Sequence, residues 1–300
     1  MFNIIGVVIF LPFLGFFQNL VLHTSGELPR QIANANTLFK VINTIIFLPF
    51  IRSYAALLSK IVKGKEEEEI EYMPKYLERH LLNTPPIAME AAIKETVRTL
   101  SFTQRMVTIA ANSLIKNDAK SLEKITRGEE AVDSLREAIT DYLVELMQQE
   151  LSREESIKIP ALIHVINDVE RIGDHAENLG ALAEQKINNK TPFSNMAIEE
   201  LKKMYDAINQ MLSSSIKALE SNNIDEAKLI LMQESFINSL RDTLKENHVG
   251  RLENRQCNVL SGVVFLDTIS NFEKIGDHLT NIAQKVIDGL QWDGGRGARQ

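Results

Sequence analysis

Two pairs of carboxylates share one spacing and lie about one hundred positions apart. Glu170 and Asp174 are four residues apart in a stretch with helical periodicity, and Glu273 and Asp277 repeat that arrangement. At this spacing two side chains lie one above the other on a helix, where like charges destabilise the helix. A cation held between the carboxylates would offset this repulsion. The two pairs therefore indicate two cation sites.

The residues around the two pairs are duplicated as well. The strings ERIGDHAEN, which starts at Glu170, and EKIGDHLTN, which starts at Glu273, agree at six of nine positions. Repetition of this length marks duplicated structural units. The sequence therefore predicts a twofold internal repeat in which each copy carries one acidic helix.

A weaker acidic pattern precedes each pair. Glu129 and Asp133 align with Glu234 and Asn238, and both strings end in Ser-Leu-Arg. Oxygen-rich clusters on facing helices are how helical bundles hold hard or borderline cations. The predicted metal ligands are the acidic side chains of these four helices: Glu129, Asp133, Glu170, Asp174, Glu234, Glu273 and Asp277.

Neighbouring residues leave a simpler interpretation open. Arg171 and Lys274 follow the two glutamates, and their charges could neutralise the acidic faces without any metal. Gly173 and Gly276 lie inside the predicted helices, where glycine costs about 1 kcal/mol relative to alanine. Close approach of another helix is the favoured reason for these glycines, and room for a cation is the alternative.

The duplicated histidines do not indicate catalysis. His175 and His278 each follow an aspartate directly, and one residue turns about 100° around a helix, so both point away from the carboxylate face. Neither a nucleophile elbow nor a phosphate-binding glycine loop is evident in the sequence. We therefore expect no catalytic residues and no enzymatic activity.

The N-terminal sixty residues have the character of membrane segments. Residues 1–22 contain no ionisable side chain. A stretch of about 20 apolar residues is long enough to cross the hydrocarbon core of a bilayer. A second apolar stretch over residues 37–62 is interrupted by Lys40 and Arg52, and the strings MFNIIGVVIFLPF and LFKVINTIIFLPF agree at seven of thirteen positions. A secretory signal would need a basic start and a small-residue cleavage site, which are missing. Paired interrupted segments are typical of transporters built from repeats.

The remaining chain reads as soluble and helical. Residues 1–63 carry a net charge of +4, so the rest of the −7 chain carries −11, which argues against a nucleic-acid partner. The basic residues that follow the second apolar stretch place this acidic part in the cytoplasm.

Apolar positions in the acidic part advance by threes and fours from Leu162 to Ala183 and from Val264 to Val286, as in buried helix stripes. Cys257 is the single cysteine, so no internal disulfide forms.

Turn-forming residues divide the helical part into six helices. The predicted breaks lie near Asn117, Ser152, residues 189–191, Asn222 and residues 248–250. We expect an all-α fold in which two tandem three-helix units form an antiparallel bundle behind short N-terminal membrane segments. The expected division of the chain begins with membrane segments over 1–63 and a charged linker over 64–86. The three-helix repeats follow over 87–190 and 191–290, and a disordered tail ends the chain over 291–300.

The paired acidic motifs inside duplicated three-helix units resemble PhoU domains, which are cytoplasmic phosphate-signalling modules. The resemblance covers roughly residues 87–290 and rests on Glu170, Asp174, Glu273 and Asp277. It implies multinuclear clusters of divalent or trivalent metal ions at these motifs, with iron or zinc as the usual metals.

The front of the chain carries a second resemblance. The string RQIANANTLFKVINTIIFLPF, after a related FLPF segment, is similar to the closing membrane segments of bacterial sodium/phosphate cotransporters, many of which end in a PhoU-like domain. The paired Gln-Ser-Ser motifs of that family are not found in residues 1–63. We therefore expect the C-terminal part of a transporter, which needs the missing segments to bind inorganic phosphate and sodium.

Two functions follow from these resemblances. The first is a part of a sodium-dependent phosphate transporter in the inner membrane, whose metal-binding cytoplasmic domain regulates phosphate uptake. The alternative is a membrane-tethered adaptor that docks on a separate phosphate transporter or a sensor kinase and moves no solute itself. A homodimer is a further possible assembly.

Overall fold

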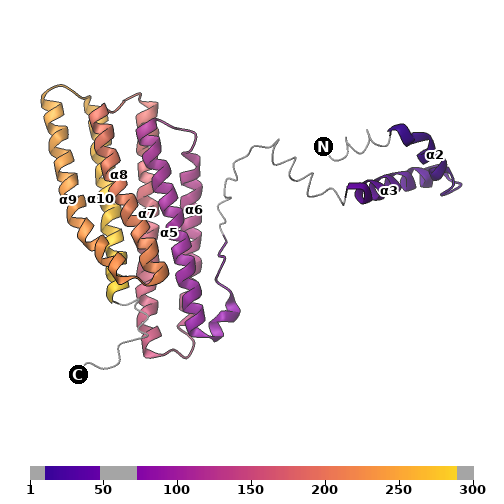
Figure 1. The fold of residues 1–300 in the computed structure, drawn as a ribbon, viewed down its shortest axis with the longest axis horizontal. Coiled ribbons are helices and arrows are strands. Elements are labelled where there is room, and N and C mark those ends of the chain that lie inside the picture. The colour runs from indigo at the N-terminus through magenta and orange to yellow at the C-terminus, as the bar shows by residue number, and fades with distance from the viewer. Residues whose placement is uncertain (1–10, 48–72, 289–300) are drawn as a thin grey trace. The chain divides into compact units, whose positions relative to one another are not determined.

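The computed structural model describes residues 11–47 and 73–288 of the 300-residue chain. The chain divides into two compact units, Met1–Glu69 and Ile70–Gln300, each of which is described by itself. Figure 1 shows the second unit as a bundle of long helices. The predicted tail over 291–300 and the glutamate run of the predicted linker lie outside the described residues.

The described part of the first unit is a short helical hairpin. A 3-10 turn, η1 (Leu11–Phe13), leads into α2 (Leu14–Leu22), and α3 (Leu28–Phe47) follows. The turn between the helices is held by the Gln31 side-chain amide, which donates to the Ser25 carbonyl at 2.6 Å. Many apolar side chains of the hairpin are exposed, including Phe16 at 75%.

The predicted membrane segments are not confirmed. Among residues 11–47 and 73–288, no helix combines the length and the apolar character needed to cross a bilayer. The helix α2 has 9 residues, and α3 has 20 residues but carries Arg30 and Lys40 along with several polar side chains. Residues 1–10 and 48–63 of the predicted segments lie outside the described part of the chain.

Six long helices form the second unit, as the sequence predicts. They are α5 (Pro85–Lys116), α6 (Glu123–Leu146), α7 (Arg153–Asn188), α8 (Asn195–Ser221), α9 (Ile224–Glu253) and α10 (Val259–Asp288). The helices α5, α7, α8 and α10 pack against one another in the centre. The outer helix α6 packs on α5 and α7, and the outer helix α9 packs on α8 and α10, at opposite sides of the bundle in Figure 1.

Local sequence signals explain most helix ends. Pro85 opens α5, where its missing N–H is not needed. Ser152 caps α7 in a reciprocal capping box with Glu155. Asn117 and Asn222 end α5 and α8 in the left-handed conformation, which asparagine adopts more readily than most residues. The predicted breaks at these positions are confirmed.

The predicted break at residues 248–250 is wrong. The helix α9 continues to Glu253, and the chain turns only between Asn254 and Asn258. Gly250 is tolerated inside the helix because its position faces open space and costs only helix propensity. Arg255, with φ 56°, makes the reversal instead.

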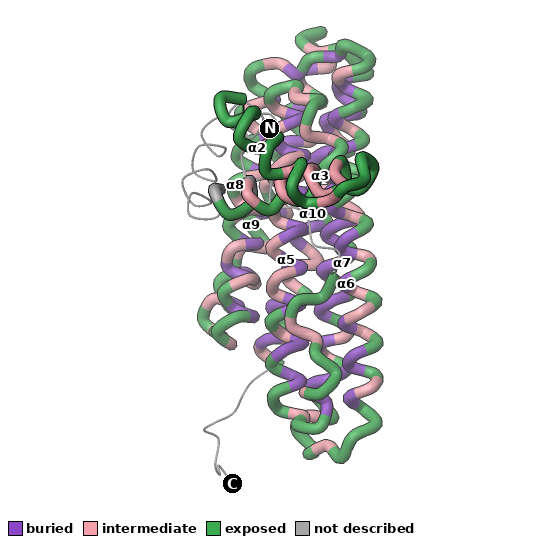
Figure 2. The backbone as a smooth tube through the Cα atoms, turned by 90° about the vertical axis from the view of Figure 1, so that its right-hand side faces the viewer, coloured by how far each residue is buried: buried purple, intermediate pink, exposed green. Residues whose placement is uncertain are grey.

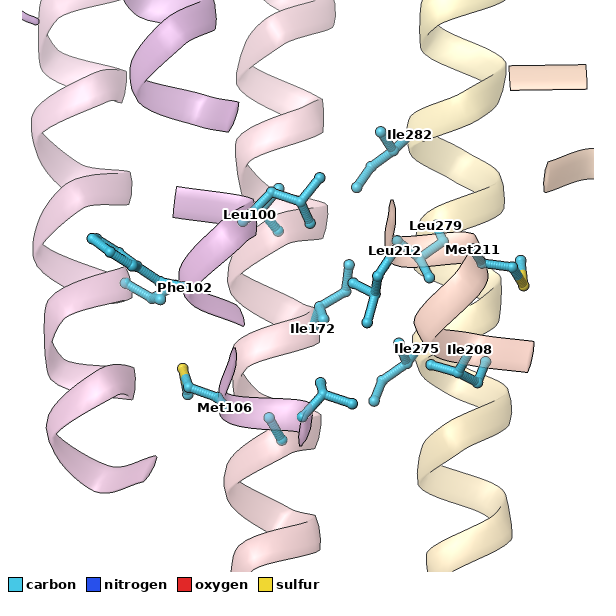
Figure 3. Close-up of a cluster of buried hydrophobic side chains, with 14 of the residues drawn as sticks. Leu100, Phe102, Met106, Ile172, Ile208, Met211, Leu212, Ile275, Leu279 and Ile282 are labelled. Carbon is cyan, nitrogen blue, oxygen red and sulfur yellow. The ribbon is translucent and has the colours of Figure 1, made fainter. Parts of the chain in front are cut away.

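The predicted apolar stripes form the core. In α7 all seven stripe residues from Leu162 to Ala183 are fully buried, and in α10 all seven from Val264 to Val286 are buried. Figure 2 shows the buried residues along the inward faces of the helices. Figure 3 shows how Ile172 of α7, Ile208 of α8 and Ile275 of α10 belong to one apolar cluster. The two repeats therefore share a single core.

The second half of the predicted linker is not a free solvated segment. Residues 79–83 form η3 (Arg79–Asn83), and Leu82 is buried in the bundle core. The buried carboxylate of Glu95 in α5 accepts the backbone N–H groups of Lys75 and Tyr76, each at 2.7 Å. The chain is thus fixed to the bundle before the first long helix begins.

Lys186 is a buried cation at the junction of the repeats, and it gives a prediction. Its ammonium group donates to the Asn117 side chain and lies 4.7 Å from the centre of the Phe193 ring. Burial lowers the pKa of Lys186 below its ordinary 10.5. The folded state therefore binds fewer protons here than the unfolded state, so this residue adds stability as the pH rises toward 10.5.

Replacement of Lys186 by methionine removes the buried charge. The stability of the variant relative to the native protein is expected to be highest near neutral pH and to fall as the pH rises toward 10. Urea unfolding at several pH values measures this difference. Replacement of the exposed Lys217 by methionine is the control and should give a difference that does not change with pH. A flat profile for Lys186→Met would contradict the prediction.

Candidate functional site

The first acidic face lies between α6 and α7 and consists of Glu129, Asp133, Glu170 and Asp174. The glutamate of each pair is partly buried, and Glu170 retains 20% side-chain exposure. The sequence predicts these four residues as one set, and the structure places them close enough to influence one another electrostatically. The apolar stripes of both helices are buried in the core, which fixes the faces that carry these four side chains.

Glu129 has the clearest electrostatic signature of this face. Burial raises the pKa of Glu129 above its ordinary value, and the charges of Asp133, Glu177 and Asp174 raise it further. A carboxyl group surrounded by other carboxylates favours a counter-ion or a proton. Glu177, one turn after Asp174, is a member of this group that the sequence pattern does not single out.

Glu170 is only partly neutralised by arginines. Burial and then the charge of Asp174 raise the pKa of Glu170, whereas the charges of Arg171 and Arg136 act in the opposite direction. Arg171 lies 3.6 Å from Glu170 and 3.2 Å from Asp174, but its side chain is 62% exposed. Solvent screens such an exposed pair, so repulsion within the face remains.

The predicted ligands of the second repeat are Glu234 on α9 and Glu273 and Asp277 on α10, and the interactions described join only the two α10 residues, which form the second acidic face, through Lys274. Arg241 of α9 donates to Glu273 at 2.5 Å, and Glu273 is 10% exposed. Lys274 lies 3.4 Å from Glu273 and 2.8 Å from Asp277. Arg241 therefore holds Glu273 directly, whereas the Lys274 side chain is 53% exposed, so solvent screens its pairs as it screens those of Arg171.

The two faces differ although they arose by duplication. Arg241 aligns with Arg136 at the end of the repeated Ser-Leu-Arg string, and only Arg241 makes a direct ion pair with the acidic helix among the interactions described. The repeated string is the signal by which both arginines could have been found. As placed, no group of three or more His, Cys, Asp or Glu side chains within residues 11–47 and 73–288 is arranged to hold a metal ion. A metal at either face would require side-chain rotation, and at the second face also displacement of Arg241 and Lys274.

Each duplicated histidine contacts the other repeat, which the sequence does not predict. Nδ1 of His175 lies 2.9 Å from the Asn271 side-chain oxygen, and Nδ1 of His278 lies 2.8 Å from Asp168. The two rings are 5.6 Å apart between centroids. Asp168 and Asn271 occupy equivalent positions of the repeats, so the histidines join α7 to α10 by reciprocal contacts.

The duplicated glycines allow close packing of helices. A Cβ on Gly173 would lie 3.4 Å from Val132, and a Cβ on Gly276 would lie 3.4 Å from Ile208 and 3.5 Å from Ile237. These neighbours are apolar core residues. A Cβ at these distances would make ordinary van der Waals contacts, so close helix approach is compatible with the glycines without requiring them, and the apolar neighbours offer no ligand to a cation.

The fold and the paired acidic faces define a duplicated three-helix-repeat protein with an all-α bundle. A family model described as the PhoU domain matches residues 96–183 and 201–286. This chain belongs to the PhoU domain family. The two matched segments coincide with the two structural repeats.

Curated relatives divide into two kinds. The proposed inorganic phosphate export protein YjbB of Escherichia coli K12 is 22% identical over 302 aligned positions, which cover 99% of this chain and 55% of that protein. A phosphate-specific transport system accessory protein, the PhoU homolog of Clostridium acetobutylicum, is 23% identical and covers 66% of this chain and 90% of its own length. A PhoU homolog 1 of Methanothermobacter thermautotrophicus is 27% identical over 71% of this chain.

Solved structures show the same fold. PhoU from Pseudomonas aeruginosa superposes with a TM-score of 0.63 at 19% identity and covers 67% of this chain and 96% of its own. The phosphate transport system regulatory protein PhoU from Streptococcus pneumoniae gives a TM-score of 0.62 at 18% identity, over 68% of this chain. The likeness therefore establishes the fold of the bundle.

Proposed function

We propose that this protein regulates phosphate transport across the membrane as the PhoU-like part of a transporter. The observation that carries the proposal is the extent of the similarity to YjbB, which covers 99% of this chain and therefore includes the segment before the bundle. The exposed apolar side chains of α2 and α3 support contact between that segment and a bilayer. The chain spans 55% of the length of that relative, so the solute pathway is assigned to segments outside this chain.

The regulatory element in this proposal is the first acidic face. A divalent or trivalent metal ion, such as iron or zinc, binds Glu129, Asp133, Glu170 and Asp174 after their side chains rotate toward it. Support comes from the raised pKa values of Glu129 and Glu170, which burial raises first and the charges of neighbouring carboxylates raise further. Metal binding would remove this repulsion, draw α6 and α7 together and shift the bundle between two states.

The adaptor function is the second candidate, and one observation favours it. The accessory PhoU homologs match the bundle and cover 90% of their own length, so this fold also exists without a transporter attached. In this function the bundle docks on a separate transporter or sensor kinase. The two candidates differ in whether the phosphate pathway belongs to the same polypeptide.

Phosphate flux in the native cell tests the proposal. Membrane vesicles are prepared from cells that produce the native chain and from cells that produce the Asp133→Asn/Asp174→Asn variant. Labelled phosphate is placed inside the vesicles to measure one direction of transport and outside them to measure the other. We expect the variant to change phosphate flux severalfold and to leave sulfate flux unchanged. Export and uptake are distinguished by the side on which the label is placed, and sodium coupling by exchange of sodium for potassium.

Three outcomes decide between the candidates. Unchanged phosphate flux in the variant and after removal of the whole chain would refute a role in transport. Phosphate flux in vesicles that contain only the polypeptide encoded by this gene supports the first candidate, in which the bundle is part of a transporter. Flux that requires a separate membrane protein, recovered with the tagged chain, supports the adaptor.

A further inference from the structure

A cavity of about 220 Å³ lies in the second repeat, and none of the predicted metal ligands lines it. The last turns of α9 and the first residues of α8 and α10 surround it. A water molecule occupies about 30 Å³ in the liquid, so the cavity has room for a small ion together with some water.

His248 of α9 brings an unpartnered polar atom to this cavity. The residue is 3% exposed, and its Nε2 atom has no hydrogen-bond partner within the described residues. A Cβ added to Gly262 would lie 2.4 Å from Nε2, so the imidazole edge fills the space that this glycine opens in the cavity wall. Buried polar atoms in proteins are nearly always bonded, and an unbonded one is explained when a ligand or water belongs there.

The charge that lines the cavity is positive. Arg251 contributes to the wall and is 4% exposed, and none of the described lining residues is a carboxylate. Glu200 pairs with Arg251 at 2.9 Å but does not line the cavity, and its Oε1 also accepts from Asn247 at 2.9 Å. The carboxylate therefore holds the guanidinium in place and offsets part of its charge.

Two helix N-termini add to this positive potential. Ser194 caps α8 and Asn258 caps the start of α10, and both residues line the cavity. The first N–H groups of a helix carry partial positive charge and bind anions. The cavity thus combines a buried arginine, a buried imidazole and two helix starts.

The first repeat provides an internal comparison. The alignment that matches Glu234 with Glu129 and Glu273 with Glu170 also matches the cavity residues with four apolar ones. The residues His248, Arg251, Gly262 and Phe265 correspond to Leu143, Leu146, Ile159 and Leu162, all of which are fully buried. The three-helix fold therefore does not need the cavity or its charges, since its other copy fills the same place with core.

We propose that this cavity binds a small oxyanion, such as inorganic phosphate, between Arg251, His248 and the starts of α8 and α10. The imidazole donates from Nε2 to the anion, and Gly262 keeps the imidazole in place. Burial and then the charge of Arg251 lower the pKa of His248, with Glu200 opposing them, so the empty cavity favours the neutral ring. A bound anion favours the protonated ring, so binding takes up a proton and tightens as the pH falls.

Titration of the purified full chain with anions tests the proposal. Calorimetry with a chelator present uses inorganic phosphate, sulfate and glycerol phosphate, the last to represent a phosphoryl group carried by a larger molecule. Sulfate keeps its charge between pH 6 and pH 8, so its affinity reports the protein's proton uptake alone. We expect one anion per chain and at least tenfold weaker sulfate binding at pH 8 than at pH 6.

Matched variants locate the site. His248→Gln and Gly262→Ala are expected to weaken binding at least tenfold. His164→Gln, on the exposed surface of α7, and Gly250→Ala, at a glycine that faces open space, should bind as the native protein does. Thermal unfolding of each variant confirms that it is folded, and His248→Gln carries the conclusion if Gly262→Ala does not fold.

The proposal fails if none of the three anions binds, or if His248→Gln binds as tightly as the native protein. It depends on the cavity alone and not on the proposed role in phosphate transport. Loss of anion binding and loss of phosphate flux are therefore separate results, and either can occur without the other.

Discussion

Addition of zinc, iron or manganese to the chelator-treated protein is expected to raise its unfolding temperature by about 5–10 °C. A ligand that binds only the folded state adds about 2.7 kcal/mol of stability at a hundred times its Kd. For a domain of 150–250 residues, 1 kcal/mol corresponds to a shift of about 2–4 °C. Differential scanning fluorimetry of the full chain with each metal in turn measures the shift.

The acidic faces predict where this stabilisation originates. Repulsion among Glu129, Asp133 and Asp174 is only partly offset in the first face by the exposed Arg171, whereas the less exposed Arg241 binds Glu273 directly in the second. The double variant Asp133→Asn/Asp174→Asn should therefore lose the metal-induced shift and be at least as stable as the native protein without metal.

Two control variants make the test specific. Asp141→Asn changes an exposed carboxylate of α6, and the shift should remain complete. Asp277→Asn tests the second face, and we expect it to keep most of the shift. The metal proposal is excluded if every metal leaves the native protein unchanged, and its placement is excluded if the double variant gains as much as the native protein.

The sequence predicts the helical repeats well because the fold depends on a pattern that recurs over many residues. The stripe from Leu162 to Ala183 requires one helix face to be buried, and no single substitution or side-chain conformation decides the result. Caps such as Ser152 with Glu155 are equally local, so they can be read directly from four adjacent residues.

The charge balance of the candidate site could not be predicted in the same way. Which arginine reaches which carboxylate depends on the conformation of a long side chain and on the packing between two helices. Arg136 and Arg241 have the same place in the repeated string, yet Arg241 bonds Glu273 directly, whereas Arg136 acts on Glu170 through its charge alone. The difference between the two faces is therefore a tertiary property.

The cavity at His248 shows a related limit. A histidine, a valine and a glycine in succession predict a break because glycine and polar residues interrupt helices. The structure continues α9 instead, since His248 and Arg251 are both buried against Phe265 of α10. Tertiary packing outweighs the local propensity here.

Replacement of Glu95 by alanine is expected to destabilise the bundle by about 3–5 kcal/mol, the range observed when one partner of a buried ion pair is removed. Glu95 is fully buried, pairs with Arg98 and accepts two backbone N–H groups, so the variant leaves all three donors without their acceptor. At about 2–4 °C per kcal/mol, the unfolding temperature should fall by roughly 6–20 °C.

The same substitution should also release the segment before the bundle. Arg98 donates to the Met73 carbonyl and Glu95 holds Lys75 and Tyr76, so these contacts connect α5 to the chain that leads from the first unit. Hydrogen exchange at Lys75 and Tyr76 should therefore accelerate more than exchange in the centre of α7 under conditions where the variant is folded.

Glu90→Ala is the matched control for this prediction. Glu90 lies on the same helix and pairs with Lys94 at 2.6 Å, but both side chains are 57% exposed. Because exposed pairs contribute little, the control should leave the unfolding temperature and the exchange of Lys75 almost unchanged. If Glu95→Ala behaves like Glu90→Ala in both measurements, the buried carboxylate does not hold the segment of residues 73–76 on the bundle.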